Sequence, residues 1–191
     1  MTTIDTVFKL STLLGEVLTS RHLKVATAES CTAGAISAAI TDIAGSSAWF
    51  DRGFICYSNQ AKNEMLHVDM STLKEFGAVS ERVIKSMANN AVHLSDADVS
   101  VAISGIAGPG GGSKDKPVGT VWISWAGDRL PTQAQCFNFT GNRQDIRQQA
   151  LVKALEGLIE RSAPKHHSRL TTTTKHRYFF ALKPNCEVST A

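Results

Sequence analysis

Polar side chains that could take part in acyl transfer follow three apolar, strand-like stretches of the sequence. Ser30 comes after "LKVATA", Tyr57 and Lys62 lie at and beyond the end of "WFDRGFICYS", and Ser104 precedes a glycine-rich loop. The carboxyl ends of parallel strands meet at one edge of a sheet, where open α/β proteins gather their active sites. The sequence therefore predicts one site that contains these residues.

Ser30 could be a nucleophile or could belong to a helix cap. At a strand-to-helix junction, its hydroxyl would lie near free N–H groups of the following helix, which could stabilise an oxyanion. Serine and threonine are also favoured as N-cap residues, so Ser30 or Thr32 could simply start the helix. Placement in the sequence leaves both interpretations open.

A nucleophilic serine needs a base, and the sequence offers Lys62. The histidines lie outside the predicted strand ends: His22, His67, His93, His166, His167 and His176. Lys62 would have to be neutral, which means lowering its pKa from about 10.4 towards 7 or 8 at a cost of roughly 4 kcal/mol. The alternative is an ordinary exposed helix lysine. Tyr57 could reach the same pocket or could lie in water at the sheet rim.

A glycine-rich loop and two arginines suggest an anionic ligand. The loop contains Gly105, Gly108 and residues 110–112, where main-chain N–H groups could approach an anion closely. It lacks the Walker A pattern and a following helix, so a lid over a small anion and a plain turn both remain open. Arg143 and Arg147 lie at the start of the last predicted helix, against the dipole preference, although solvated arginines are common there.

Helical and strand patterns alternate through the first half of the chain. We expect a first helix whose apolar stripe contains Ile4, Val7, Phe8, Leu10, Leu14, Val17 and Leu18. A strand at 23–28, a helix at 32–43 capped by Gly45 and a strand at 49–58 follow. Further helices are predicted at 59–68, with Asn59 as N-cap, and at 81–95, starting at Ser80.

The second half of the chain completes the predicted sheet. A nearly continuous apolar strand spans 97–108, and strands at 120–127 and 133–139 are joined by the turn "DRLPT". A final helix spans 143–161. This order predicts a three-layer α/β/α sandwich around a mixed sheet. We expect residues 1–161 to form the domain and the basic residues 162–191 to be a flexible tail.

Charge and cysteine content exclude several classes of protein. The net charge of +3 comes from the tail, which carries 5 − 1 = +4, whereas residues 1–161 carry 15 − 16 = −1. This argues against a nucleic-acid-binding face. The four cysteines lack CxxC or zinc-like spacing, which favours free thiols and no metal. Without a signal peptide or an apolar run near 20 residues, a cytoplasmic protein with no membrane segment is expected.

Five motifs in this order resemble the CinA C-terminal domain family, whose catalytic members include PncC-type nicotinamide-nucleotide amidases. They cover about residues 5–161: "ATAESCTAG", "GSSAWFDRGFICYSNQAK", "GAVSERV", "AISGIAGPGGGSKDKPVGTV" and "FTGNRQDIR". The resemblance implies an α/β/α domain that self-associates, most simply as a dimer. It also implies hydrolysis of nicotinamide mononucleotide to nicotinate mononucleotide and ammonia, without a metal or cofactor.

The resemblance also implies roles for individual residues. Ser30 matches the nucleophile, Lys62 its general base, and Tyr57 a group that orients or relays the proton. The implied substrate-binding positions are the oxyanion-site backbone at Thr32, Ala33 and Gly34, the pocket wall at Ser104, Gly105 and Gly108, and a phosphate contact at Arg143.

Two positions depart from the family pattern. Ala33 stands where the family usually has glycine, and its methyl could crowd the pocket or disfavour a positive φ. Asn142 stands where the family usually has aspartate, which could loosen Arg143. The alternative function is therefore a catalytically inactive or altered-specificity paralogue that binds a pyridine nucleotide or similar phosphorylated ligand. A third hypothesis, an interaction protein linked to DNA uptake or damage, is disfavoured by the nearly neutral domain.

Overall fold

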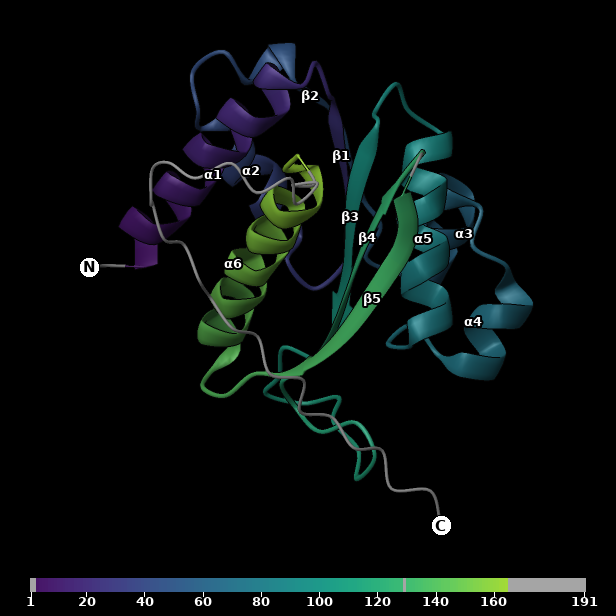
Figure 1. Ribbon diagram of the computed structural model, residues 1–191. Coiled ribbons are helices and arrows are strands. Elements are labelled where there is room, and N and C mark those ends of the chain that lie inside the picture. Colours follow the sequence, from purple (N-terminus) through teal and green to yellow (C-terminus); the bar gives the residue numbers. More distant parts are fainter. Residues whose placement is uncertain (1–2, 129, 165–191) are drawn as a thin grey trace, which may run out of the picture.

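A mixed five-stranded sheet lies between two layers of helices (Figure 1). The computed structural model describes residues 3–128 and 130–164. Helices α1 (Thr3–Ser20), α2 (Ala35–Thr41) and α6 (Arg143–Ser162) cover one face, and α3 (Asn59–Leu66), α4 (Met70–Phe76) and α5 (Glu81–His93) cover the other. The predicted α/β/α sandwich is confirmed. Most of the predicted tail lies outside the described residues.

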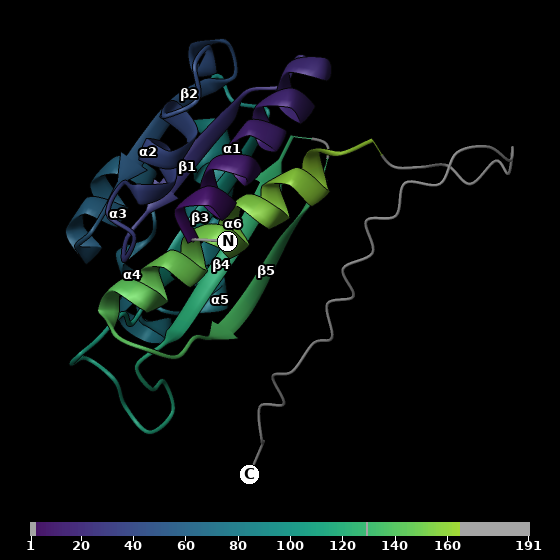
Figure 2. The same ribbon diagram turned by 90° about the vertical axis from the view of Figure 1, so that its left-hand side faces the viewer.

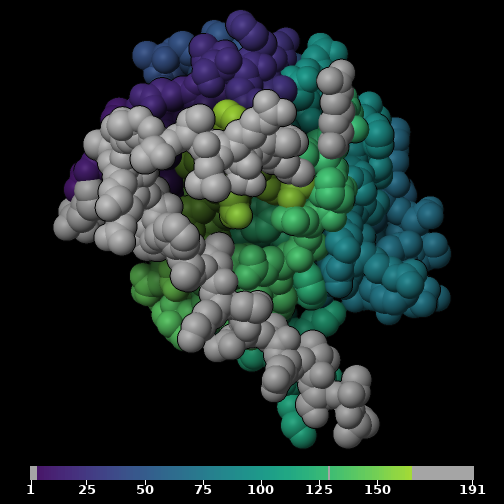
Figure 3. Space-filling model, viewed as in Figure 1, coloured from purple at the N-terminus to yellow at the C-terminus, as the bar shows by residue number. Residues whose placement is uncertain are grey.

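The strand order brings four carboxyl ends to one edge of the sheet. The order is β2 (Phe50–Ile55), β1 (Val25–Glu29), β3 (Val99–Gly105), β4 (Thr120–Gly127) and β5 (Leu130–Asn138). β1 pairs in parallel with both β2 and β3, whereas β4 is antiparallel to β3 and to β5. Strand β5 therefore runs in the same direction as β3. The ends of β1, β2, β3 and β5 meet at the edge from which the glycine-rich loop projects (Figures 1 and 3).

The two faces of the sheet carry separate cores. On one face, α1 and α6 lie side by side (Figure 2), and Leu14, Leu18 and Leu155 pack in one cluster with Val101 and Ile123 of the sheet. On the other face, α5 packs against small sheet residues in a second cluster, whose members include Ile84, Met87, Ala28, Ala102 and Ala126. Strand β1 is buried along its whole length, as expected of a strand covered on both faces.

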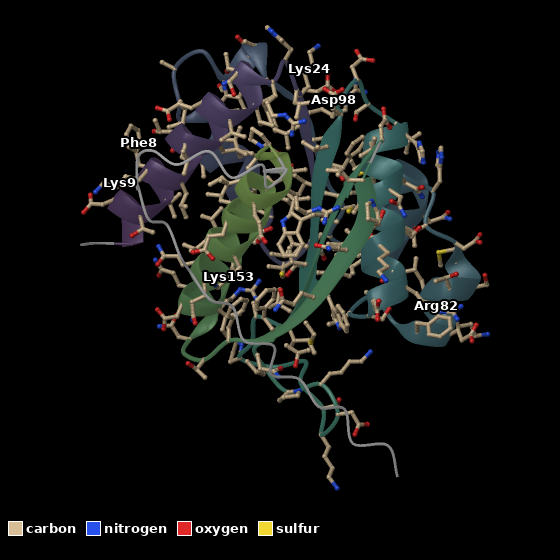
Figure 4. The ribbon with its side chains drawn as sticks, viewed as in Figure 1. Phe8, Lys9, Lys24, Arg82, Asp98 and Lys153 are labelled. Carbon is tan, nitrogen blue, oxygen red and sulfur yellow. The ribbon has the colours of Figure 1, made fainter. Side chains whose placement is uncertain are left out.

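The apolar stripe predicted for the first helix is only partly buried. Leu14 and Leu18 are fully buried, but Ile4 is 75% exposed and Phe8 is 57% exposed. Figure 4 shows Phe8 projecting from α1 away from the sheet. The main contacts of α1 are with α6 and α2 and not with the strands, so a narrower stripe than predicted is covered.

The second helix is shorter than predicted. α2 begins at Ala35 and not at Thr32, because the chain first forms a turn after β1. It ends with Asp42 as its C-cap. Gly45, predicted as that cap, has φ 83° and precedes the short 3₁₀ helix Ser46–Ala48.

Local capping bonds set the start of the next helices. Ser58, and not the predicted Asn59, caps α3, and its hydroxyl accepts from the amide of Ala61 at 3.0 Å. Ser80 caps α5 as predicted, accepting from the amide of Val83. The seven-residue α4 was not predicted, since so short a helix gives little periodic signal. Strand β5 starts inside the predicted turn.

Gly157 in α6 is required by the packing of Trp125. A Cβ at this position would overlap the Cε2 and Cζ2 atoms of Trp125, whose Nε1 donates to the carbonyl of Ala154 at 3.0 Å. We expect Gly157→Ala to lower the free energy of unfolding by about 1–3 kcal/mol through overpacking, although alanine is intrinsically the better helix former. Urea unfolding measures this change.

Gly110→Ala is the matched control, because a Cβ there would meet nothing within 4 Å. Its free energy of unfolding should stay close to that of the wild type. An equal or greater stability of the Gly157→Ala variant would contradict the packing argument.

Candidate active site

Ser30 and Lys62 are hydrogen-bonded to each other in the interior of the protein. The distance from Lys62 Nζ to Ser30 Oγ is 3.1 Å. Ser30 directly follows β1, and its amide donates to the carbonyl of Ile103 in β3 at 3.0 Å, which fixes the start of the turn. Lys62 lies in the first turns of α3. The end of β1 and the start of α3 thus place a hydroxyl against an amine.

The surroundings of Lys62 favour a neutral amine. Its side chain is 1% exposed, so the alternative of an exposed helix lysine is wrong. Nζ also donates to the main-chain carbonyls of Cys56 at 3.0 Å and Tyr57 at 3.1 Å. Burial lowers the pKa of Lys62, and no carboxylate forms an ion pair with it in the part of the chain described here.

The geometry sets the role of each position on the amine. The two carbonyls can only accept, so two N–H bonds point to them. The third tetrahedral position faces Ser30 Oγ. In the neutral amine this position holds the lone pair, which can accept the serine proton.

The two thiols beside Ser30 and Lys62 are weak nucleophiles. Burial raises the pKa of both Cys31 and Cys56 to about 11, so both are neutral at physiological pH. Cys31 and Cys56 are buried free thiols. Cys186 lies outside the described residues.

The turn between β1 and α2 uses most of its own amide groups. The amide of Ala33 donates to the carbonyl of Ser30 at 3.1 Å, and that of Gly34 donates to Glu29 Oε2 at 2.9 Å. Among residues 3–128 and 130–164, the amide of Thr32 has no such acceptor. Of the three predicted oxyanion positions, Thr32 is therefore the one whose amide is not bonded to a described residue, although Thr32 is fully buried.

Neither Ser30 nor Thr32 caps α2. The N-cap is Gly34, which makes no side-chain cap bond. The Thr32 hydroxyl is buried without a hydrogen-bond partner in the described structure. The capping interpretation is wrong because the carboxylate of Glu29 accepts from the first amides of the helix instead.

Ala33 adopts the conformation that glycine favours. Its φ is 52°, and Gly34 follows with φ 93°. A left-handed conformation costs an L-residue roughly 1–2 kcal/mol. The methyl group therefore does not prevent the positive φ, and the residue is exposed and not packed into the core.

Tyr57 and Arg143 form a second cluster beside the serine–lysine pair. The guanidinium of Arg143 donates to the carbonyl of Gly108 at 2.8 Å and to the hydroxyl of Tyr57 at 3.1 Å. The Tyr57 side chain is 58% exposed. Its hydroxyl thus contacts Arg143, while its main-chain carbonyl contacts Lys62.

Asn142 caps the start of α6 with its side chain. Its Oδ1 accepts from the amides of Gln144 at 2.8 Å and Asp145 at 3.1 Å, and Asp145 Oδ2 accepts from the amide of Asn142 at 2.9 Å. This capping box fixes the start of α6. The guanidinium of Arg143 is held by Gly108 and Tyr57, and the expectation that losing a carboxylate here loosens it stays a prediction.

The predicted pocket wall follows β3. Ser104 is buried at the end of this strand. A Cβ at Gly105 would lie 2.8 Å from the carbonyl oxygen of Thr120, and one at Gly108 would lie 2.6 Å from Val118. Both glycines are therefore needed for the close approach of the loop to β4 and to the segment before it.

Sequence reasoning missed the role of two charged residues that hold the turn. Glu29 is fully buried, and the guanidinium of Arg147 donates to the carbonyl of Thr32 at 2.7 Å. Arg147 was expected only to indicate an anionic ligand. For Glu29 a signal existed: a charged residue that closes an otherwise apolar strand requires buried partners.

The part of the chain that the structure describes has one further hollow of note, at a distance from Ser30. Within the described ranges, no group of three metal-ligating side chains occurs, and no helix is long and apolar enough to cross a membrane. A hollow of about 600 Å³ is lined by residues that include Arg21, Asp98 and Arg161. Figure 4 shows Lys24 and Asp98 at the end of the sheet opposite the glycine-rich loop, so this hollow is distant from Ser30.

Comparisons with known proteins agree on one family. The model of the CinA C-terminal domain matches residues 7–162. A nicotinamide-nucleotide amidohydrolase PncC from Enterobacter agglomerans is 54% identical over 150 residues, covering 78% of this chain and 90% of the relative. The PncC protein of Escherichia coli K12 is 51% identical over 152 residues, covering 78% and 91%.

Solved structures show the same likeness. The competence/damage-inducible protein CihA from Agrobacterium tumefaciens matches with a TM-score of 0.80 and 43% identity, covering 81% of this chain and 94% of that one. A CinA superfamily protein from Klebsiella pneumoniae 700603 matches with a TM-score of 0.78 and 36% identity, covering 82% and 97%.

The strain at Ala33 gives a testable difference in stability. We expect Ala33→Gly to raise the free energy of unfolding by about 0.5–1 kcal/mol, because relief of the left-handed conformation exceeds the added entropy of the unfolded chain. Thermal or urea unfolding measures the change. Ala38→Gly, an exposed position inside α2, should instead lower stability by about 1 kcal/mol. A loss of stability in both variants would refute strain at Ala33.

Proposed function

The chain belongs to the CinA C-terminal domain family, and from this membership and the geometry of the site we propose that it is a nicotinamide-nucleotide amidohydrolase. The reaction converts nicotinamide mononucleotide and water into nicotinate mononucleotide and ammonia. One observation carries the proposal: Lys62 Nζ lies 3.1 Å from Ser30 Oγ in a buried position, and none of the described carboxylates forms an ion pair with it. The amidohydrolase names of the relatives supply the substrate.

In the first half of the reaction, Ser30 Oγ attacks the carboxamide carbon. The serine proton passes to the lone pair of Lys62 Nζ, and a C–O bond forms as the carbonyl π bond opens to an oxyanion. The intermediate collapses, the C–N bond breaks, and the ammonium of Lys62 returns the proton to the departing ammonia. An ester between Ser30 and the nicotinoyl group remains, so one difficult step becomes two easier ones.

In the second half, water hydrolyses this ester. Lys62 Nζ accepts a proton from water, the hydroxide attacks the acyl carbon, and the bond to Ser30 Oγ breaks. The proton returns to Ser30 Oγ, which restores the starting state. The pyridinium charge of the substrate withdraws electrons from the carbonyl and assists both attacks.

The surrounding residues bind and orient the substrate in this proposal. The amide of Thr32 donates to the oxyanion. Arg143 binds the phosphate, since a guanidinium suits a bidentate contact with phosphate oxygens. Tyr57 holds Arg143 through its hydroxyl and Lys62 through its carbonyl. Self-association as a dimer stays a prediction that analytical ultracentrifugation can check.

The alternative of an inactive or altered-specificity paralogue rested on Ala33 and Asn142. Ala33 takes up the positive φ of the turn, and Asn142 forms a complete capping box. Neither observation favours the alternative over the amidohydrolase.

Ser30→Ala should abolish ammonia release from nicotinamide mononucleotide. We expect a fall in kcat/KM of about 10³-fold or more, because the attacking oxygen is removed. A coupled ammonia assay measures it. Ser20→Ala is the control. Ser20 is an exposed serine at the C-terminal end of α1, so this variant should keep full activity. Equal rates for Ser30→Ala and the wild type would exclude Ser30 as nucleophile, and no ammonia from the wild type would favour the paralogue.

The pH dependence tests Lys62 as the base. Only the neutral amine accepts a proton, so kcat/KM should rise with pH through the pKa of Lys62 and then level off. Burial lowers this pKa, so the rise should be complete at a lower pH than for an ordinary lysine, whose pKa is about 10.4. A kcat/KM profile between pH 5 and 10 checks the direction.

Lys62→Arg is the matched variant, because it keeps a cation and its donors but does not deprotonate. We expect it to be inactive across the whole range. Activity in this variant, or a profile that falls as pH rises from 5 to 8, would contradict the proposed base.

A further inference from the structure

A buried carboxylate joins the end of β1 to the start of α2. Glu29 is 0% exposed. Its Oε2 accepts from the amides of Gly34 at 2.9 Å and Ile36 at 3.1 Å, and its Oε1 accepts from the amide and the hydroxyl of Ser37, both at 2.8 Å. All four partners are donors, so both carboxylate oxygens are needed as acceptors.

The carboxylate belongs to a larger polar network. The hydroxyl of Ser37 is 2.6 Å from Thr27 Oγ1. Thr27 and Glu29 lie two residues apart in β1 and therefore point to the same face of the sheet. Gly53 of the neighbouring strand leaves room for this network, because a Cβ there would lie 3.0 Å from Thr27 Oγ1 and overlap Ser37 Oγ. The hydroxyls of Thr27 and Ser37 therefore occupy the space beside the Glu29 carboxylate.

The network closes a ring around the nucleophile. Glu29 immediately precedes Ser30, and its side chain binds the amide of Gly34 at the far end of the same turn. The main chain of residues 29–34 and the Glu29 side chain therefore form one closed loop. Because this loop is short and closed, Ser30 has little freedom to move relative to Lys62.

We propose that Glu29 is a positioning residue that holds Ser30 Oγ in line with Lys62 Nζ, an inference that rests on the proposed amidohydrolase function. Glu29 acts through the turn and not on the substrate, since its carboxylate is fully buried. A role limited to stabilising α2 would change stability only. A positioning role also changes the rate of every reaction at Ser30.

Glu29→Gln tests this role with nearly constant shape. In either orientation, the NH₂ of glutamine would face two of the four donors, so two of the hydrogen bonds that fix the turn should be lost. We expect kcat for nicotinamide mononucleotide to fall by about 10²-fold, the effect of an ångström-scale misplacement, with KM within about twofold of the wild type. The second-order rate of Ser30 labelling by a fluorophosphonate, followed by intact mass, should fall in parallel.

Two further variants control for folding. Ser20→Ala changes an exposed serine outside the network and should keep wild-type kcat and labelling rate. Ser37→Ala removes one of the four donors and should lower both rates several-fold. Urea unfolding identifies folded variants. If Glu29→Gln does not fold, the kcat and labelling rate of Ser37→Ala test the proposal instead. Wild-type values of both in that variant would overturn it.

The two readouts separate this inference from the proposed function. A folded Glu29→Gln variant with wild-type kcat and labelling rate, or with a change in KM alone, overturns the positioning role. If the wild type labels rapidly but releases no ammonia, the amidohydrolase proposal fails, and slower labelling of Glu29→Gln still supports positioning. A wild type that neither labels nor releases ammonia refutes both, because Ser30 is then not an aligned nucleophile.

Discussion

A buried amine that forms no ion pair with the described residues is the constraint on which the rest of the structure depends. Burial without a carboxylate partner disfavours the ammonium form of Lys62, and two carbonyls and one hydroxyl hold the amine in place. The carbonyls belong to the segment after β2, and the hydroxyl follows β1. The parallel pairing of these strands therefore supplies all three contacts at once.

The charged residues around this amine hold main-chain segments in place and do not pair with each other. Glu29 binds the first amides of α2, Arg147 binds the carbonyl of Thr32, and Arg143 binds the carbonyl of Gly108. Each contact joins segments that are distant in sequence or ties a strand to a helix. As a result, the turn that carries Ser30 is fixed from the side of β1 and from the side of α6.

The sequence was sufficient for the layers, the mixed sheet and the meeting of Ser30, Tyr57, Lys62 and Ser104 at one edge, because periodicity and parallel topology determine these features. Helix boundaries were less predictable. The start of α2 depends on Glu29, whose hydrogen bonds arise only when β1 and α2 pack together. The exposure of Ile4 and Phe8 likewise depends on which neighbours α1 finds, which an amphipathic pattern does not specify.

Asparagine and aspartate at position 142 can form the same capping bonds but differ by one negative charge. An asparagine side-chain oxygen accepts the same amide bonds as a carboxylate would, so α6 begins at the same place and Arg143 keeps its contacts. The mouth of the site nevertheless carries one negative charge fewer than an aspartate at 142 would give it. With less negative charge nearby, the Arg143 guanidinium attracts anions more strongly over long distances. This attraction raises the rate at which an anionic ligand encounters the protein, and it weakens as rising ionic strength shortens the Debye length.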